Sequence, residues 1–279
     1  MKKLALQWVY TVLGALVVGP VAGVIASSVR GLNGSHESTG LLSSEGVVGL
    51  LKLVACVVLA GIVMVTGAWL GFIRRAMFVS GLVLAWAATR TGTVPGVIRD
   101  ANGEGVFGRL AIEGLVLGAI YATFAWLTVI IRRKDDDSIA LPSKADGIAI
   151  LAMILVGLVC GWAIAQDGST GQTLFAAFVS GLFGTFVARV ISPKCSYTSL
   201  IWAASALACL APFIWNLQHG STALSDMYGG DIAGYALVTP LAWLSGMSLG
   251  IWGGASWADS MVQKHEPQGR STTRRVAQG

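Results

Sequence analysis

The sequence predicts an all-α integral membrane protein, a polytopic bundle of about eight transmembrane helices. Of its 279 residues, 54% are hydrophobic and only 12% are charged, whereas soluble domains contain about 25% charged residues. The apolar residues gather in runs of about 20, the length that crosses the hydrocarbon layer of a bilayer. The basic residues gather in alternate gaps between these runs. Together these observations exclude an ordinary soluble domain.

The apolar runs define the expected spans. They cover residues 4–29, 47–71, 76–95, 108–131, 147–166, 171–191, 198–217 and 232–256. Each is expected to be helical, because backbone groups must be satisfied within the span where water is absent. The third run is irregular: it is apolar as far as Ala88, but Gly92 and Pro95 follow and would interrupt a helix. We expect either a short span with a polar exit or a broken helix that lines a cavity.

The distribution of Lys and Arg orients the protein, because basic residues in short loops stay on the cytoplasmic side. One set of gaps holds Lys2, Lys3, Arg74, Arg75, Arg132, Arg133, Lys134, Lys144, Arg189, Lys194, Lys264, Arg270, Arg274 and Arg275. The other set holds Arg30, Lys52, Arg90, Arg99 and Arg109. The pattern places both termini in the cytoplasm, with the spans in a bacterial inner membrane. It also accounts for the net charge of +5 without a nucleic-acid partner.

The chain reads as one transmembrane domain, residues 1–262, followed by a basic cytoplasmic tail, 263–279, which is expected to be disordered. A polar segment around Arg132–Lys144 divides the domain into halves, 1–134 and 145–262. The partner that the sequence implies directly is the lipid bilayer. The first run follows Met1-Lys2-Lys3 and has two interpretations, a retained helix or a cleaved signal peptide; its length favours the helix.

A short motif occurs once in each half. Phe78-Val79-Ser80-Gly81-Leu82 returns as Phe178-Val179-Ser180-Gly181-Leu182, and Ala122-x-Phe124-x-Trp126 resembles Ala211-x-Phe213-x-Trp215. If spans two to four repeat as spans five to seven, the offset of three helices inverts one copy relative to the other. Inverted repeats are common in transporters, where the solute site lies between the copies. The alternative is chance similarity between Gly-rich apolar helices.

Three charged residues fall within or near the predicted spans. Glu113 and Lys52 lie inside spans, and Arg90 lies near the end of the third. Ionised groups are costly in lipid and usually face protein or water. The topology places all three in the outer third of the membrane, where they would form a solute or ion vestibule. The alternatives are that the basic side chains reach the interface and that Glu113 is only a structural ion-pair partner.

Catalytic and cofactor motifs receive little support. Gly246-Met247-Ser248-Leu249-Gly250 fits G-x-S-x-G, but it lies in an apolar run, and the three histidines lie outside the spans. Asp226 and Asp231 flank a Gly pair and look like loop residues. The four cysteines form no CxxC pair and no metal-ligand spacing. We therefore assign no catalytic residue, metal or cofactor, and favour a protein that is not an enzyme over a membrane-embedded hydrolase.

Two functional hypotheses remain. The first is a small permease or channel-like unit for a small solute or ion. It rests on the repeat, the irregular third span and the charged residues. The second is a non-catalytic structural or assembly subunit of a larger membrane complex, because few polar residues lie at mid-bilayer. A homo-oligomer would suit the first hypothesis, and a membrane-complex partner the second.

The charge asymmetry predicts a reporter-fusion pattern. Periplasmic reporters fused after Arg30, Gly168 or His219 should be active, because those positions fall in gaps on the outer side. Fusions after Arg75 or Lys134 should be inactive. A reversed result at two or more positions would contradict the topology.

Overall fold

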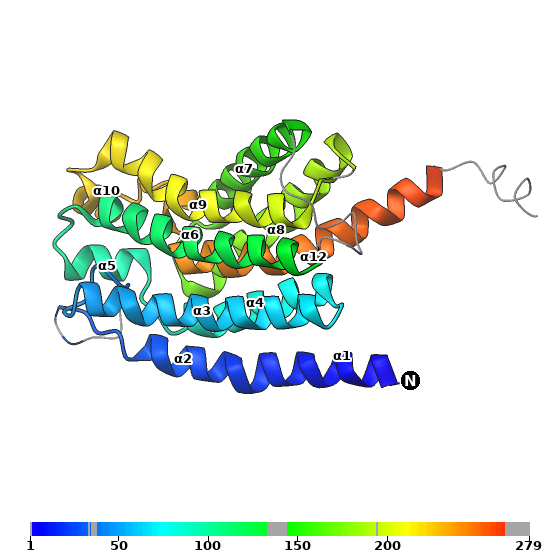
Figure 1. Cartoon of the computed structure of the whole chain (residues 1–279). Coiled ribbons are helices and arrows are strands. Elements are labelled where there is room, and N and C mark those ends of the chain that lie inside the picture. The colour runs from blue at the N-terminus through cyan, green and yellow to red at the C-terminus, as the bar shows by residue number, and fades with distance from the viewer. Residues whose placement is uncertain (1, 33, 35–37, 133–143, 194, 266–279) are drawn as a thin grey trace, which may run out of the picture.

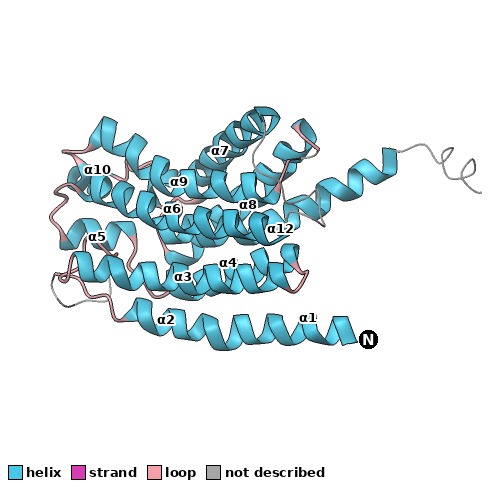
Figure 2. Cartoon of the chain, in the orientation of Figure 1, coloured by secondary structure: helices cyan, strands magenta, loops and turns pink. Residues whose placement is uncertain are grey.

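A computed structural model describes the chain except for residues 1, 33, 35–37, 133–143, 194 and 266–279. All regular elements in the described part are helices (Figure 2). The central part of the predicted 132–144 divide and nearly all of the predicted tail, 266–279, lie outside the described residues.

The helices form a bundle with short elements clustered at one end (Figure 1). The long helices are α1 (Lys2–Leu13), continued by the π-helix η1 (Gly14–Val18) and α2 (Gly19–Ser27), then α3 (Val47–Trp69), α4 (Ile73–Ala88), α6 (Val106–Arg132), α7 (Lys144–Ile164), α8 (Thr170–Ile191), α9 (Tyr197–His219) and α12 (Pro240–His265). The short helices are α5 (Val94–Asp100), α10 (Ala223–Gly229) and α11 (Gly234–Leu237). We call the end that holds α5 and α10 the α5 end, and the opposite end, where α1 begins, the α1 end.

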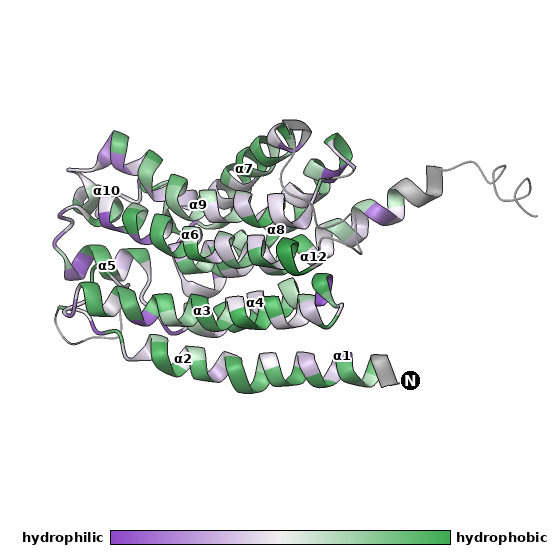
Figure 3. Cartoon of the chain, viewed as in Figure 1, coloured by the Kyte–Doolittle hydropathy of each residue, from purple (hydrophilic) through white to green (hydrophobic). Residues whose placement is uncertain are grey.

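The chain is a multi-pass membrane protein by the length and composition of its helices. In the described part, 6 helices are long and apolar enough to cross a membrane. These are Leu4–Ser27, Val47–Trp69, Val106–Ile131, Asp146–Ile164, Thr170–Ile191 and Tyr197–His219. Hydrophobic residues predominate along the long helices (Figure 3). Many large apolar side chains are exposed on the outside of the bundle; Val24 and Leu217, for example, are each 69% exposed. Such a surface suits lipid rather than water.

The expected count of eight spans is not confirmed, because the helices of the third and last predicted spans, α4 and α12, are not among these 6. Helix α12 is long enough, with 26 residues, but it is less apolar than the 6 helices counted. The third was expected to reach residue 95, but α4 ends at Ala88 and has only 16 residues. At 1.5 Å per residue this is about 24 Å, less than the hydrocarbon thickness. The last was expected to begin at residue 232, but α12 begins at Pro240. Thr239, rather than a carboxylate such as Asp231, caps α12 by accepting from Ala242 N at 3.3 Å.

The first membrane helix contains a widened turn, and its sequence explains why. Pro20 has no N–H, and its ring would clash with the carbonyl four residues earlier, that of Leu16. The backbone adopts the π-helix η1 immediately before Pro20, and Gly19 N–H bonds to Gly14 O, five residues back. The wider turn lets the helix continue through the proline.

Helix α12 occupies the centre of the bundle, where it packs between α4 and α8 and also meets α6 and α9. Its contact with α8 is backbone against backbone. A Cβ added at Gly246 would lie 2.8 Å from Leu174 O, and one at Gly250 would lie 2.8 Å from the carbonyl carbon of Gly181. Small residues permit this approach, which supplies van der Waals contact in a solvent that offers no hydrophobic driving force.

Both copies of the Phe-Val-Ser-Gly-Leu motif pack on α12, at neighbouring positions. A Cβ at Gly81 would meet Leu249 N at 3.0 Å and Ser248 Cβ at 3.1 Å. A Cβ at Gly181 would meet Met247 Cα at 2.7 Å. The two motifs thus flank one segment of α12, with α4 on one side and α8 on the other.

This packing predicts that Gly181→Leu destabilises the protein, because the side chain would push α8 away from α12. We expect the free energy of unfolding to fall by about 1–3 kcal/mol or more, as in other overpacked cores. Gly171→Leu is the matched control, because nothing lies within 4 Å of a Cβ at that position of the same helix. Thermal unfolding in detergent measures both. Equal melting temperatures for the two variants would contradict the close packing.

Candidate functional site

Glu113 is fully enclosed near the α5 end, where it holds the loop between α2 and α3. The described residues of this loop are 28–32, 34 and 38–46, and we call them the 28–46 loop. Glu113 is 1% exposed, although it lies on a membrane-spanning helix, α6. Its carboxylate oxygen Oε2 accepts a hydrogen bond from Leu41 N at 3.0 Å. A main-chain N–H to a carboxylate is a charge-assisted bond, stronger than one between neutral groups. Glu113 therefore fastens the 28–46 loop to α6.

The loop approaches this carboxylate closely because Gly40 lies beside it. A Cβ at Gly40 would stand 3.1 Å from Glu113 Oε2 and 2.8 Å from Leu50 Cα. Any larger residue would push the loop off both α3 and α6. Gly40 is thus part of the geometry that encloses Glu113.

Lys52 also binds the 28–46 loop, but at a different point. Its ammonium group forms an ion pair with Glu45 and donates to Ser28 O at 3.1 Å. The Lys52 and Glu45 side chains are 25% and 38% exposed. Lys52 was expected to share a vestibule with Glu113 and Arg90, and its carboxylate partner in the described structure is Glu45.

Arg90 lies at the end of α4, with its side chain exposed and its stem beside α2. Its Cγ is 3.7 Å from where a Cβ at Gly23 would be. The described contacts therefore do not bring Arg90, Lys52 and Glu113 into one ion-pair cluster. Two of the three, Glu113 and Lys52, share the same loop instead.

The segment around Gly92 and Pro95 separates α4 from α5. Gly92 N donates to Ser38 O at 2.8 Å, which ties this break to the 28–46 loop. Helix α5 then begins after Thr93, whose hydroxyl accepts from Gly96 N at 3.3 Å, with Pro95 in the first turn. Proline is favoured there because a first-turn N–H has no helical partner. After this break the chain continues as the short helix α5.

Pro95 lines a pocket of about 220 Å³ at this end, together with Asp167 and Asp226. The N–H of Ser169 bonds to the exposed Asp167 carboxylate at 2.9 Å and lowers its pKa below the ordinary range. Asp226 pairs with His219 at 3.2 Å. Two carboxylates, Asp167 and Asp226, thus line this pocket. In the described residues no group of three or more His, Cys, Asp and Glu side chains is arranged to hold a metal ion.

A chain of buried hydroxyl groups lies deeper, where α4, α6 and α12 meet. Tyr121 Oη is 3.0 Å from Ser80 Oγ and 3.0 Å from Ser248 Oγ, and Ser248 Oγ donates to Leu244 O at 2.6 Å. Each of the three side chains is 0% exposed. The hydroxyl of Ser248 donates its only proton to Leu244 O, so Tyr121 must donate to Ser248. The hydroxyl of Tyr121 then accepts from Ser80. We call these three residues the hydroxyl chain.

Sequence analysis did not single out the hydroxyl chain, although signals for it exist. Ser80 belongs to the first repeated motif, and Ser248 is the serine of the G-x-S-x-G segment. Tyr121 falls in the middle of a span, whereas membrane tyrosines gather at the interfaces. In the described structure Ser248 bonds to a tyrosine hydroxyl and a backbone carbonyl, so it has the surroundings of a structural or solute-binding serine rather than of a nucleophile.

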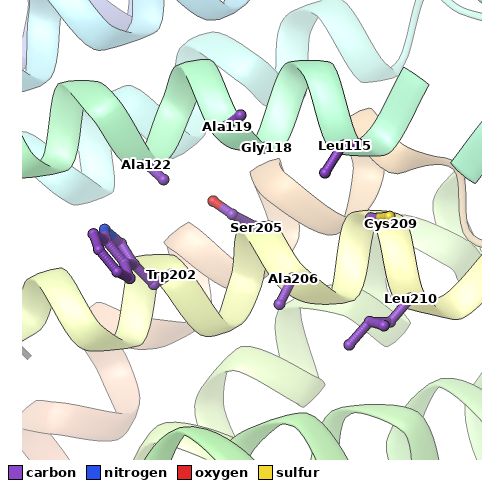
Figure 4. Close-up of a pocket in the computed structure, with 9 residues that line it drawn as sticks. All are labelled: Leu115, Gly118, Ala119, Ala122, Trp202, Ser205, Ala206, Cys209 and Leu210. Carbon is purple, nitrogen blue, oxygen red and sulfur yellow. The ribbon is translucent and has the colours of Figure 1, made fainter. Parts of the chain in front are cut away.

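An apolar groove of about 350 Å³ opens between α6 and α9 (Figure 4). The figure shows Ser205 between the two helices, with Trp202 toward one end of the groove and Cys209 toward the other. Ser205 Oγ is buried and has no hydrogen-bond partner among the described residues. Gly118 permits the close approach of α6 and α9, because a Cβ at this position would stand only 2.7 Å from Ser205 O.

The enclosure of Glu113 predicts a graded loss of stability. Glu113→Leu should lower the free energy of unfolding by about 1–3 kcal/mol, because Leu41 N loses its acceptor inside the protein. Glu113→Gln should lose less, since its amide carbonyl can still accept. Glu45→Gln, which removes only a partly exposed ion pair, should cost about 1 kcal/mol or less.

Melting temperatures in detergent and the rate of proteolysis in the 28–46 loop measure this series. If Glu113→Leu matched Glu45→Gln in both, Glu113 would not be the anchor of the loop.

No protein-family model, curated protein or solved structure matches this chain.

Proposed function

We propose that this chain is a small inner-membrane permease, with eight spans and both termini in the cytoplasm, that passes a small solute or ion. In this proposal α4 and α12 join the six apolar helices as spans. Helix α12 is less apolar, but it is buried among other helices and need not dissolve in lipid. The short α4 is continued at the α5 end by the polar break and by α5.

The order of helix contacts supports an inverted repeat. In the first copy, spans two to four, helix α3 packs against α4 and α6. In the second copy, spans five to seven, the equivalent helix α7 packs against α8 and α9. Helices α6 and α9, which occupy the same place in the two copies, pack against each other. Helix α12 then stands between the copies.

The observation that carries the proposal is the shared contact of both repeated motifs with one segment of α12. Gly81 and Gly181 meet residues 247–249, and Ser248 in that segment belongs to the hydroxyl chain. Transporters with inverted repeats bind their solutes where the copies meet, near the bilayer midplane. Hydroxyl groups that donate and accept suit a small polar solute, which would replace one of the bonds within the chain.

The 28–46 loop would then be the outer closure of the permease. It is held by Glu113 through Leu41, by Gly92 through Ser38, and by Lys52 through Glu45. Opening must break the hydrogen bond from Leu41 N to the Glu113 carboxylate, because that bond holds the loop against α6. In a permease, Glu113→Gln should therefore alter transport while leaving the protein expressed and folded.

The subunit hypothesis has one observation of its own, the groove between α6 and α9. Its apolar lining and the unpaired Ser205 Oγ would suit a helix of a membrane-complex partner that supplies a hydrogen bond. Purification in mild detergent separates the two hypotheses. A stable stoichiometric partner favours the subunit, and a lone homo-oligomer favours the permease.

Cysteine labelling tests the permease without knowledge of its solute. In a variant that lacks the four native cysteines, Ser248→Cys and Ser80→Cys should react with a water-soluble maleimide in membranes, because an alternating pathway admits water to the hydroxyl chain. Val159→Cys is the lipid-facing control, as Val159 is 62% exposed on α7. Ser44→Cys, on the exposed part of the 28–46 loop, is the positive control.

Addition of Glu113→Gln should speed the reaction at position 248, because a neutral amide carbonyl holds Leu41 N less strongly than a carboxylate does. If positions 80 and 248 stayed as unreactive as position 159 while position 44 reacted, the central pathway would be rejected and the subunit hypothesis favoured.

A further inference from the structure

A second polar pocket lies at the α1 end, far along the bundle from the 28–46 loop. It has a volume of about 330 Å³, within the range of small-ligand pockets. Gln7 of α1, Trp252 of α12 and the segment 71–75, which joins α3 to α4, line it. Figure 1 shows that α1 begins, and α3 passes into α4, at this same end. The pocket thus lies at the α1 end of the bundle, between α1, α12 and the connection of α3 to α4.

Two arginines of that segment give the pocket its charge. Arg75 lies with its guanidinium carbon 5.5 Å from the centre of the Trp8 ring, and its Nη1 is buried without a hydrogen-bond partner in the described part of the chain. Arg74 forms an ion pair with Asp259 at 2.7 Å and also lies over the Tyr197 ring. Since Asp259 offsets only one of the two cations, the pocket remains positive. A buried guanidinium nitrogen without an acceptor indicates an anion.

The backbone adds donors to the same wall. Ile73, Arg74 and Arg75 form the first turn of α4, where N–H groups have no carbonyl four residues earlier within the helix. These groups reinforce the attraction of the arginines for an anion.

The surrounding tryptophans indicate the depth of the pocket in the membrane. Trp8, Trp69 and Trp252 belong to this end and are 59%, 70% and 46% exposed. Exposed tryptophans mark the level of the lipid head groups. An anion at that level, between helices whose outer faces are apolar, is most simply the phosphate of a lipid. Basic pockets between membrane helices recognise anionic head groups in this way.

We propose that this pocket binds the phosphate of one anionic phospholipid, with Arg75 as the principal contact, Arg74 held ready by Asp259, and Gln7 facing the head group. The acyl chains would lie along the exposed apolar faces of α1 and α12. The site does not depend on the permease proposal, because a structural subunit would hold the lipid equally well.

Native mass spectrometry of the full chain in detergent tests the proposal, with phosphatidylglycerol, phosphatidylcholine and soluble glycerol 1-phosphate as separate probes. The wild type should bind one phosphatidylglycerol about tenfold or more tightly than phosphatidylcholine, the ratio expected from one charge-assisted contact. Arg75→Gln should remove this preference. Arg109→Gln is the matched control: it removes the same charge from an exposed position near the start of α6 and should leave the preference intact.

Gln7→Glu is a second variant, which keeps both arginines. It tests the lipid site even if Arg75→Gln fails to fold. Its carboxylate would repel the phosphate and should also abolish the preference. Retention of the wild-type preference in a folded Arg75→Gln or in Gln7→Glu would overturn the proposal, as would equal binding of the two lipids. Binding of glycerol 1-phosphate as tight as that of phosphatidylglycerol would overturn the assignment to a lipid.

Discussion

The backbone contact between α12 and α8 is the constraint on which the rest of the bundle depends. Lipid tails are as apolar as leucine, so helices in a membrane gain little by hiding apolar side chains from lipid. Close approach must supply the attraction, and only small residues permit it. Because Gly246 and Gly250 meet α8, and Gly81 brings α4 to the other side of α12, the central helix fixes the positions of both of its neighbours.

The polar groups described above differ in kind between the core of the bundle and its ends. In the core, the hydroxyl chain runs from Ser80 to the Leu244 carbonyl without a formal charge. Near the α5 end, Glu113 takes a main-chain N–H as its partner. At the α1 end, Arg189 is only 8% exposed, donates to Pro193 O at 3.1 Å and lies over the Tyr197 ring. Charge is thus kept away from the centre, where its desolvation would cost most.

The sequence was sufficient to predict the class of fold, because apolar run length reports directly on a membrane helix; the run 47–71 is α3 to within two residues. The predicted span 76–95 runs past the end of α4 at Ala88, although the sequence also marked Ala88 as the last residue of the apolar stretch and Gly92 and Pro95 as interruptions. Glu113 stood out as a carboxylate in an apolar run, but its partner did not, because a backbone N–H such as that of Leu41 has no signature in the side-chain sequence. The two bonds of Tyr121 in the hydroxyl chain reach residues 41 and 127 positions away, and only the packing of the helices brings them together.

The central position of α12 has a consequence for the way the protein is made. This helix comes last in the order of synthesis among the described elements, yet α4 and α8 use it as their common surface. Until it is inserted, the face of α8 around Gly181 lacks this neighbour, and Tyr121 lacks the acceptor that Ser248 provides. Pairs such as α6 with α9 and α7 with α8 do not need α12 and can form before it is inserted. The contacts that α4 and α8 make with their common neighbour become possible only after residues 240–265 have left the ribosome, so the final closure of the bundle comes late.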